Sequence, residues 1–312
     1  MSHVRCANAH TVSLVAAAAS WGTATAISKR AVDEIQPLTL LPIELAVSVA
    51  VLTFAVVITR EPFRWSSEHR RLGLLGVLNP GISYALSLAG LARITASTSV
   101  LLWATEPLLI LGLAYLILKD RVTLASGIGA ATALTGVILV VFQPGAQADA
   151  TGIALTVAGV GACALYTVLS SKVLADASSL SIVLLQQAAA LIFALALLAG
   201  SFVLGDPSAV SQVSAIGWLS AAAAGVLYYA VAFWFYVNGL RGVRPAFAGM
   251  FINLIPVFGL TASYLVLGER LARRQWLGVS LVLAAVIAIA RFQVSQRQVA
   301  TRPAPTSPSP TD

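Results

Sequence analysis

Ten apolar runs of about 20 residues each divide this 312-residue chain, and they constrain its fold more than any other feature. A helix of that length rises about 30 Å, which is the thickness of the hydrocarbon core of a membrane. The runs consist mainly of Ala, Leu, Val and Ile, and the charged residues, only 10% of the chain, fall in short clusters between them. The pattern predicts an all-α integral membrane protein with ten transmembrane helices and no soluble catalytic domain.

Turn-forming residues separate the predicted spans. Asp33, Glu34 and Pro37 lie between the first two, and Gln143, Pro144 and Gly145 form a central linker. After Arg291 the chain is rich in Pro, Ser, Thr and Gln, which predicts a disordered cytoplasmic tail over 292–312. The predicted spans are 11–29, 37–59, 71–91, 95–117, 122–142, 150–171, 179–200, 213–238, 244–267 and 272–291.

The residue inventory argues against several kinds of site. The two cysteines, Cys6 and Cys163, lie far apart, and the three histidines lie at the N-terminus or in a loop, so we expect no metal or other cofactor. The net charge of +7 is spread over many short loops, as membrane orientation requires, which argues against nucleic-acid binding. None of the three lysines follows a glycine, so no phosphate-binding loop of an ATP-driven pump is present.

The distribution of basic residues predicts the orientation. With a cytoplasmic N-terminus, 13 of the 19 Lys and Arg residues lie on the inside, and the positive-inside rule favours this arrangement. We therefore expect both termini in the cytoplasm and a multi-pass protein of the cell (inner) membrane. The alternative interpretation of residues 1–28 is a cleaved signal peptide, since Arg5 precedes an Ala-rich stretch.

The chain contains an internal repeat. At an offset of 149 residues, ATEPLLILGLAYLILKDR (104–121) aligns with NLIPVFGLTASYLVLGER (253–270), and the same offset pairs Gly76 with Gly225. A second offset, 143, pairs Ser28 and Lys29 with Ser171 and Lys172. The two repeats are then residues 1–143 and 150–291, with five spans each. Because five is odd, the repeats enter the membrane from opposite sides, an architecture typical of secondary transporters with a substrate site near the midplane.

Several motifs carry a family resemblance. Trp21 and Gly22 lie in the first span with Lys29 at its end, and the fourth and ninth spans both close with Pro, Tyr and Leu-x-(Asp/Glu)-Arg. With the five-plus-five arrangement, these motifs resemble the EamA family of the drug/metabolite transporter (DMT) superfamily over nearly the whole chain. The sequence departs from internal symmetry where Ile255 replaces Glu106 and where Tyr166 lies near the position equivalent to Trp21.

The resemblance implies a fold and a function. The family fold is a ten-helix bundle in which the first, third, fourth, sixth, eighth and ninth spans line a central cavity. The family implies export of amino acids, aromatic or other apolar ones among them, or of related small metabolites by alternating access, and the chain is similar to the YddG-type amino-acid exporters. A small-molecule substrate and the lipid bilayer are the expected partners, and catalytic residues are not expected.

Polar and aromatic side chains inside the spans are the candidates for substrate binding. Ser99, Trp103 and Glu106 share one face of the fourth span, which offers an apolar side chain an aromatic wall and an amine a cation–π surface. Asn79 precedes Pro80, where a broken hydrogen-bond ladder favours a cavity. The bulk aromatics have the alternative role of packing against lipid or another helix. The predicted substrate-binding residues are Trp21, Thr25, Asn79, Tyr84, Trp103, Glu106, Tyr166, Tyr228, Tyr229, Trp234 and Asn253.

Two carboxylates lie inside predicted spans. Glu106, about 11 residues into its span, lies near the bilayer centre, where a charge costs about 2.5 to 3.5 kcal/mol. It is expected to bind a substrate amine or to cycle a proton; the alternative is a protonated side chain bonded to a neighbouring helix beside Pro107. Glu44 is expected near the interface, paired with an arginine or hydrated, and a role in coupling is the alternative. Lys29 and Lys172, at span ends, are expected to anchor the helices first and to act as gate charges second.

Three functional classes fit a membrane protein of this composition. A secondary transporter agrees best with the repeat, whether proton-coupled or a facilitator. A membrane-embedded enzyme or binding protein acting on a lipid or isoprenoid is the alternative, but it needs clustered acids or histidines, and the spans hold only the isolated Glu106 and Glu44. A passive channel fits less well, because an aromatic and weakly charged cavity suits discrete binding better than ion flow.

Overall fold

The computed structural model describes residues 2–60, 67–119, 128, 131–132, 134–136, 138–139, 149–170, 179–204, 212–240, 251 and 254–300. The residues described in this way form helices and turns, with no strand among them. Seven helices in these ranges are long and apolar enough to cross a membrane. The prediction of an all-α membrane protein with several spans is therefore confirmed.

Most spans are single helices, and three are built from shorter pieces. In chain order the elements are α1 (Ser2–Val32), α2 (Pro37–Thr59), α3 (Ser67–Leu74), η1 (Leu75–Val77), η2 (Leu78–Ile82), α4 (Ser83–Leu91), α5 (Ala96–Trp103), α6 (Glu106–Leu118), α8 (Ala150–Ser170), α9 (Ser179–Val203), α10 (Ala215–Ala224), η3 (Gly225–Val231), α11 (Ala232–Leu240), α13 (Ile255–Leu267) and α14 (Arg273–Ala300).

The seven spans are His10–Val32, Pro37–Thr59, His69–Leu91, Ala96–Ile117, Ala150–Ser170, Leu180–Val203 and Ala215–Tyr236. They correspond to the first four and the sixth to eighth predicted spans. The predicted fifth span, 122–142, lies mostly outside the described residues, and the predicted ninth is described only from residue 254 as the short apolar helix α13. The count of ten helices therefore stays a prediction.

Prolines and π-helical turns interrupt the spans that are built from several pieces. Asn79 has non-helical backbone angles (φ −143°, ψ 118°) before Pro80, because the proline ring disfavours the α conformation of the preceding residue. The fourth span is broken at residues 104–105, immediately before Glu106 and Pro107. The eighth span contains the π-helix η3. Such turns are frequent at functional sites.

The breaks recur at the repeat offset of 149 residues. Helices α6 and α13 have the same length of 13 residues, and their first and last residues are each 149 positions apart. The π-helix η2, shifted by 149, falls within η3. Lys119 follows α6 with φ 58°, and Gly268 follows α13 with φ 68°. The sequence repeat is thus accompanied by matching local backbone structure.

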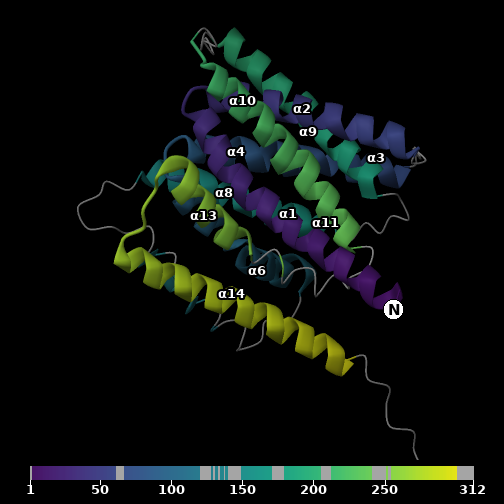
Figure 1. The fold of residues 1–312 in the computed structure, drawn as a ribbon, viewed down its shortest axis with the longest axis vertical. Helices are drawn as coiled ribbons and strands as arrows, with labels where there is room; N and C mark the ends of the chain where they lie inside the picture. Colours follow the sequence, from purple (N-terminus) through teal and green to yellow (C-terminus); the bar gives the residue numbers. More distant parts are fainter. Residues whose placement is uncertain are drawn as a thin grey trace, which may run out of the picture.

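Helices from the two parts of the chain are interleaved. Helix α1 runs through the middle of the bundle and packs along α11 and α13, which are distant from it in sequence (Figure 1). Helix α4 packs on α8, and α2 packs on α9. The largest cluster of buried apolar side chains joins residues of α1, α2, α4, α9 and η3, so the core forms only when both parts of the chain are present.

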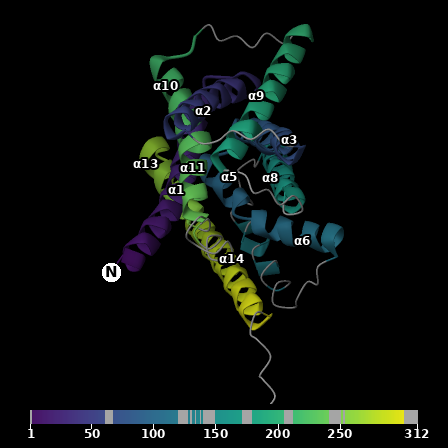
Figure 2. The ribbon, with the colours of Figure 1, turned by 90° about the vertical axis from the view of Figure 1, so that its right-hand side faces the viewer.

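The outer faces of the helices are apolar. Large exposed side chains include Val57 on α2, Val203 on α9 and Leu265 on α13, which is expected where the neighbour is lipid rather than water. Helix α14 lies along one edge of the bundle, and its C-terminal end extends beyond the other helices (Figures 1 and 2).

Helix α14 extends past the predicted end of the last span, and the tail over 292–312 stays a prediction. The helix continues to Ala300, nine residues past the predicted end of the last span at 291. The residues after Arg291 include Gln, Arg, Val and Ala, which are compatible with a helix, and no proline occurs before Pro303. Residues 301–312 lie outside the described residues.

Candidate functional site

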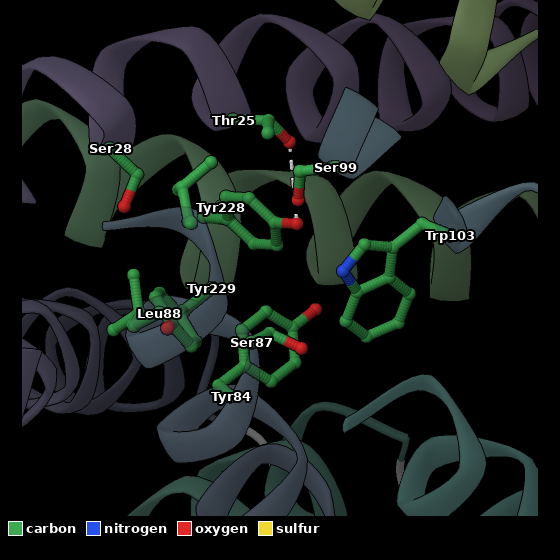
Figure 3. A pocket seen from close by; sticks show the side chains of 10 residues that line it. Thr25, Ser28, Tyr84, Ser87, Leu88, Ser99, Trp103, Tyr228 and Tyr229 are labelled. Carbon is green, nitrogen blue, oxygen red and sulfur yellow. Dashed lines mark hydrogen bonds between the residues drawn. The ribbon is translucent and has the colours of Figure 1, made fainter. Parts of the chain in front are cut away.

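A small cavity lies where α1, α4, α5 and η3 meet (Figure 3). Its volume is about 20 Å³, about the room that one water molecule needs. The lining is aromatic and hydroxylic with two leucines, and it contains no charged side chain. The lining residues are Thr25, Ser28, Tyr84, Ser87, Leu88, Leu91, Ser99, Trp103, Tyr228 and Tyr229.

Tyr84 is at the centre of the aromatic part of this cavity. Its ring centroid lies 5.4 Å from that of Trp103, 5.2 Å from that of Tyr228 and 5.0 Å from that of Tyr229. Separations in this range are favourable for aromatic pairs. The hydroxyl of Thr25 lies 3.4 Å from the Tyr228 hydroxyl, a contact marked by a dashed line in Figure 3. Five of the predicted substrate-binding residues therefore meet at one place.

Trp21 belongs to a neighbouring aromatic group on α1 and α11. Its ring packs edge-on against Phe233 at 5.2 Å and against Tyr236 at 5.5 Å. Its indole N–H is buried and has no hydrogen-bond partner among the described residues. The same holds for the side-chain oxygens of Asn79 and Ser87. Buried polar atoms in folded proteins are usually paired, so these unpaired atoms are available to a ligand.

Glu106 lies next to the cavity but not among its lining residues. At the start of α6, its carboxylate accepts a hydrogen bond from the thiol of Cys163 on α8 at 3.3 Å. Tyr84 and Tyr236 are within electrostatic range of it. The carboxylate therefore faces other helices of the protein close to the aromatic cluster.

Two other predicted site residues that the structure describes, Trp234 and Tyr166, do not line the cavity. Trp234 is 45% exposed and stacks on Phe235. Tyr228 and Tyr229, within the π-helix η3, line the cavity, whereas Trp234, on α11, does not. The hydroxyl oxygen of Tyr166 instead accepts a hydrogen bond from Nε2 of Gln186 at 2.9 Å. Asn253 lies outside the described residues.

Glu44 is the buried residue that the sequence analysis placed wrongly. It is 0% exposed, and its carboxylate accepts hydrogen bonds from the hydroxyls of Ser28 at 2.6 Å and Tyr229 at 3.2 Å. It is buried rather than near the interface, and it takes part in neither of the ion pairs given for the described residues. Its position inside an apolar run was the available signal, since ionisable residues in spans are functional candidates by default.

Two carboxylates join the chain segments at one end of the bundle. Glu34, after α1, accepts the backbone N–H of Ser214 at 2.7 Å and its hydroxyl at 2.9 Å, at the start of α10. The backbone hydrogen bond from Ser214 lowers the pKa of Glu34 below its usual value. Glu269, after α13, accepts the backbone N–H groups of Ala96 and Ser97 at 2.8 Å each, at the start of α5. Helix N-termini favour such anionic partners.

Further polar contacts lie at the same end. The ammonium of Lys29 donates to the carbonyl of Leu91 at the end of α4 at 3.1 Å and pairs with Asp33 at 2.8 Å. Lys29 thus ties α1 to α4. Arg93 lies 3.4 Å from Asp149, and the pKa of this aspartate is lowered first by a backbone N–H at the start of α8. All these contacts involve segments that the predicted topology places on the outer face.

The described residues contain no group of three or more His, Cys, Asp or Glu that could hold a metal ion. The aromatic and hydroxyl groups of the cavity are instead suited to reversible binding of a small molecule with apolar and polar parts.

Comparisons with known proteins agree on a family of transporters. The model of the EamA-like transporter family matches residues 11–142 and 150–291. An uncharacterized transporter of Archaeoglobus fulgidus is 22% identical over 283 residues, covering 87% of this chain and 95% of the relative. The uncharacterized transporter YyaM of Bacillus subtilis is 26% identical over 248 residues, covering 78% of this chain and 79% of the relative. A solved structure titled "Crystal structure of protein" has a TM-score of 0.64 at 18% identity, over 93% of this chain and 99% of that one.

Proposed function

This chain belongs to the EamA-like transporter family, and we propose that it is a secondary transporter that exports amino acids or related small metabolites across the cytoplasmic membrane. Aromatic and other apolar amino acids are the favoured substrates, and transport proceeds by alternating access. The observation that carries this proposal is the cavity, because both family-matched segments line it. Helices α1, α4 and α5 belong to the first segment, and η3 belongs to the second.

The chemistry of the cavity supports a small amphipathic substrate. The rings of Tyr84, Trp103 and Tyr228 offer a wall for an apolar side chain, and an ammonium group on an aromatic face gains cation–π attraction. The unpaired hydroxyl of Ser87 and the unpaired indole N–H of Trp21 are donors for a carboxylate. Glu106, next to the cluster, provides a negative charge for the substrate amine, and its role in proton coupling is a separate hypothesis.

The arrangement of the helices supports an inverted repeat. The offset of 149 residues relates α4 to α11 and α6 to α13, and the offset of 143 relates α1 to α8. Helix α1 packs along α11 and α13, and helix α8 packs along α4 and α6, so each contact has a counterpart with the two repeats exchanged. A twofold relation between repeats of five spans each gives ten spans, with both termini in the cytoplasm.

The small size of the cavity supports the interpretation that this structure is a closed state of the transport cycle. A volume of about 20 Å³ holds about one water molecule and cannot hold an amino acid. The carboxylate contacts of Glu34 with α10 and of Glu269 with α5 join the two repeats at the end that the predicted topology places outside. In the proposed cycle these contacts break when the cavity opens outward, and the opposite end opens toward the cytoplasm.

The test of this function is uptake of a panel of labelled amino acids by proteoliposomes that hold the purified full-length protein and an excess of the same unlabelled amino acid. We expect saturable exchange of at least one aromatic or aliphatic amino acid. In that assay Trp103→Ala should lower kcat/KM about tenfold, since an aromatic contact contributes about 1.5 kcal/mol beyond area burial. If the wild type exchanges none of the panel, the amino-acid assignment is wrong.

Trp234→Ala is the matched control for this experiment. Trp234 has the same side chain as Trp103 and lies in a span, but it is 45% exposed and outside the cavity. We expect its kcat/KM to stay within about twofold of the wild type, since exposed substitutions have small effects. Equal losses in both variants would show that the aromatic wall does not bind substrate.

A further inference from the structure

Glu44 is a buried carboxylate for which the proposed function has no use. It lies in the N-terminal half of α2 and contacts α1 and η3. Its two oxygens accept hydrogen bonds from Ser28 Oγ at 2.6 Å and from Tyr229 Oη at 3.2 Å. The ion pairs among the described residues are Lys29–Asp33 and Arg93–Asp149, and Glu44 takes part in neither. A carboxylate that is ionised and buried without a cation is strongly unfavourable.

The two hydrogen-bond donors of Glu44 connect it to the cavity. Ser28 and Tyr229 both line that cavity, and the hydroxyl group of each donates a hydrogen bond to the Glu44 carboxylate. The backbone of Tyr229 is fixed, because the side chain of Gln187 donates to its carbonyl at 2.7 Å and accepts a hydrogen bond from Ser48. Glu44 is therefore separated from the residues that line the cavity by a single hydroxyl group, that of Ser28 or that of Tyr229.

The other repeat shows what fills the equivalent position when no charge is present. Gly76 and Gly225 are 149 residues apart, and a Cβ at Gly76 would lie 2.0 Å from the carbonyl oxygen of Gln186. A Cβ at Gly225 would lie 2.7 Å from the carbonyl oxygen of Glu44. The two glycines therefore pair Glu44 with Gln186, and Gln186 contacts a tyrosine hydroxyl as Glu44 does. The corresponding position of the other repeat is thus occupied by an uncharged amide.

The surroundings of Glu44 contain few other titratable groups. On η3 these are the phenols of Tyr228 and Tyr229, and α4 contributes Tyr84. From α1 the nearest charge is Lys29, whose ammonium is bound to Asp33 and to the Leu91 carbonyl. Helices α9 and α10 have no charged residue. A change in the charge of Glu44 is therefore not compensated by another carboxylate or by a free cation among these elements.

We propose that Glu44 is the proton-exchange residue of this transporter, reached from the cavity through the hydroxyls of Ser28 and Tyr229. When the cavity opens to one side, water delivers one proton to the Glu44 carboxylate. Tyr229 or Ser28 passes its hydroxyl proton to the carboxylate and takes one from a hydronium ion in the open cavity, which becomes water, so the hydroxyl is restored and no electrons are transferred. The carboxyl group stays protonated while the cavity is closed to both sides. The proton leaves by the same route after the cavity opens to the other side. This inference rests on the proposed transport function.

The transport test uses a pH gradient across proteoliposomes and the amino acid that the wild type exchanges fastest. One pH unit corresponds to 1.36 kcal/mol, so exchange of one proton per substrate supports about tenfold accumulation. For the wild type we expect accumulation together with proton flux, reported by a pH-sensitive dye inside the vesicles. Glu44→Gln should reduce the accumulation ratio to about one while exchange without a gradient remains within about twofold of the wild type.

Control variants separate this role from general loss of a carboxylate. Asp33→Asn removes a carboxylate at the exposed end of α1, and it should keep the full accumulation ratio. Glu106→Gln should also keep it, even where its KM rises. Accumulation that persists in Glu44→Gln, or that is lost in Glu106→Gln instead, would overturn the proposal.

A second measurement does not depend on the substrate. Infrared difference spectra of the purified protein between acid and neutral pH report the C=O band of protonated carboxyl groups. We expect a band that disappears in Glu44→Gln and that changes more slowly with pH jumps in Tyr229→Phe, which retains the packing of the ring. An unchanged band in Glu44→Gln would refute the assignment. The band does not depend on which substrate is transported, so it can be observed even if no amino acid of the panel is exchanged. The two proposals are therefore tested independently.

Discussion

At the scale of single residues, glycines set the distance between helices in this bundle, because they have no Cβ at the contact. Gly76 lies against the backbone of Gln186 on α9, where a Cβ would be 2.0 Å from the carbonyl oxygen. Because a backbone oxygen cannot move aside as a side chain does, Gly76→Ala should push η1 away from α9. We expect a loss of about 2 to 3 kcal/mol of stability, as for other overpacked sites, measured by thermal unfolding in detergent.

Gly200→Ala is the matched control for that prediction. Gly200 lies on α9, and nothing lies within 4 Å of a Cβ built there. Its replacement should leave the melting temperature equal or higher, because alanine favours a helix over glycine by about 1 kcal/mol. If Gly76→Ala unfolds at the same temperature as Gly200→Ala, the close approach seen at η1 is not present in the folded protein.

Glu34 provides a prediction about pH at the residue scale. Its pKa is lowered below the usual 4.5, mainly by the backbone N–H of Ser214. A lowered pKa means that the contact stabilises the folded state fully above pH 4.5 and that this stabilisation is lost as the pH falls through the lowered value. The melting-temperature difference between the wild type and Glu34→Gln should therefore be constant from neutral pH to about 5 and shrink at lower pH. A difference that grows on acidification would contradict this account.

Matched helix ends give a prediction at the element scale. Gly268 ends α13 in the left-handed region at φ 68°, and its N–H and that of Glu269 bond to carbonyls of the last turn. Lys119 adopts φ 58° at the equivalent end of α6. Since a side chain in this region costs roughly 1 to 2 kcal/mol, Gly268→Ala should lower the melting temperature by a few degrees. Lys119→Gly should not lower it, and equal losses in the two variants would be the contrary result.

The broken elements also show which local features the sequence predicts. Pro80 and Pro107 lie inside apolar runs, and the structure interrupts the third and fourth spans beside them, because proline removes a helical hydrogen bond. The π-helix η3 has no proline, so the sequence offers no such mark. The clustering of aromatic residues in the eighth predicted span placed Trp234 with Tyr228 and Tyr229 in the site, and the structure leaves Trp234 45% exposed and outside the cavity.

At the scale of the whole molecule, we expect the two carboxylates that join the repeats to stabilise the closed state. Glu34 and Glu269 each accept backbone hydrogen bonds at the start of a helix of the other repeat, so removing either carboxylate weakens the contact between the repeats at this end. In a Cys6→Ser, Cys163→Ala background, a cysteine introduced by Ser99→Cys reports access to the cavity. Glu34→Ala and Glu269→Ala should each speed the reaction of this cysteine with an impermeant thiol reagent added outside.

The control for this experiment is Asp33→Ala, because Asp33 pairs with Lys29 within α1 and does not join the repeats. Its labelling rate should stay near that of the parent. Labelling that is unchanged in Glu34→Ala and Glu269→Ala would show that these contacts do not hold the outer end closed.

The sequence by itself determined the membrane character, the helical class, the repeat and the family, because each depends on local composition or on spacing along the chain. It also identified Thr25, Tyr84, Trp103, Tyr228 and Tyr229, five of the ten residues that line the cavity. Only the tertiary structure decided that Glu44 is buried against Ser28 and Tyr229. The physical reason is that burial and hydrogen bonding depend on which helices of the other repeat cover a residue, and a pattern within one helix does not contain that information.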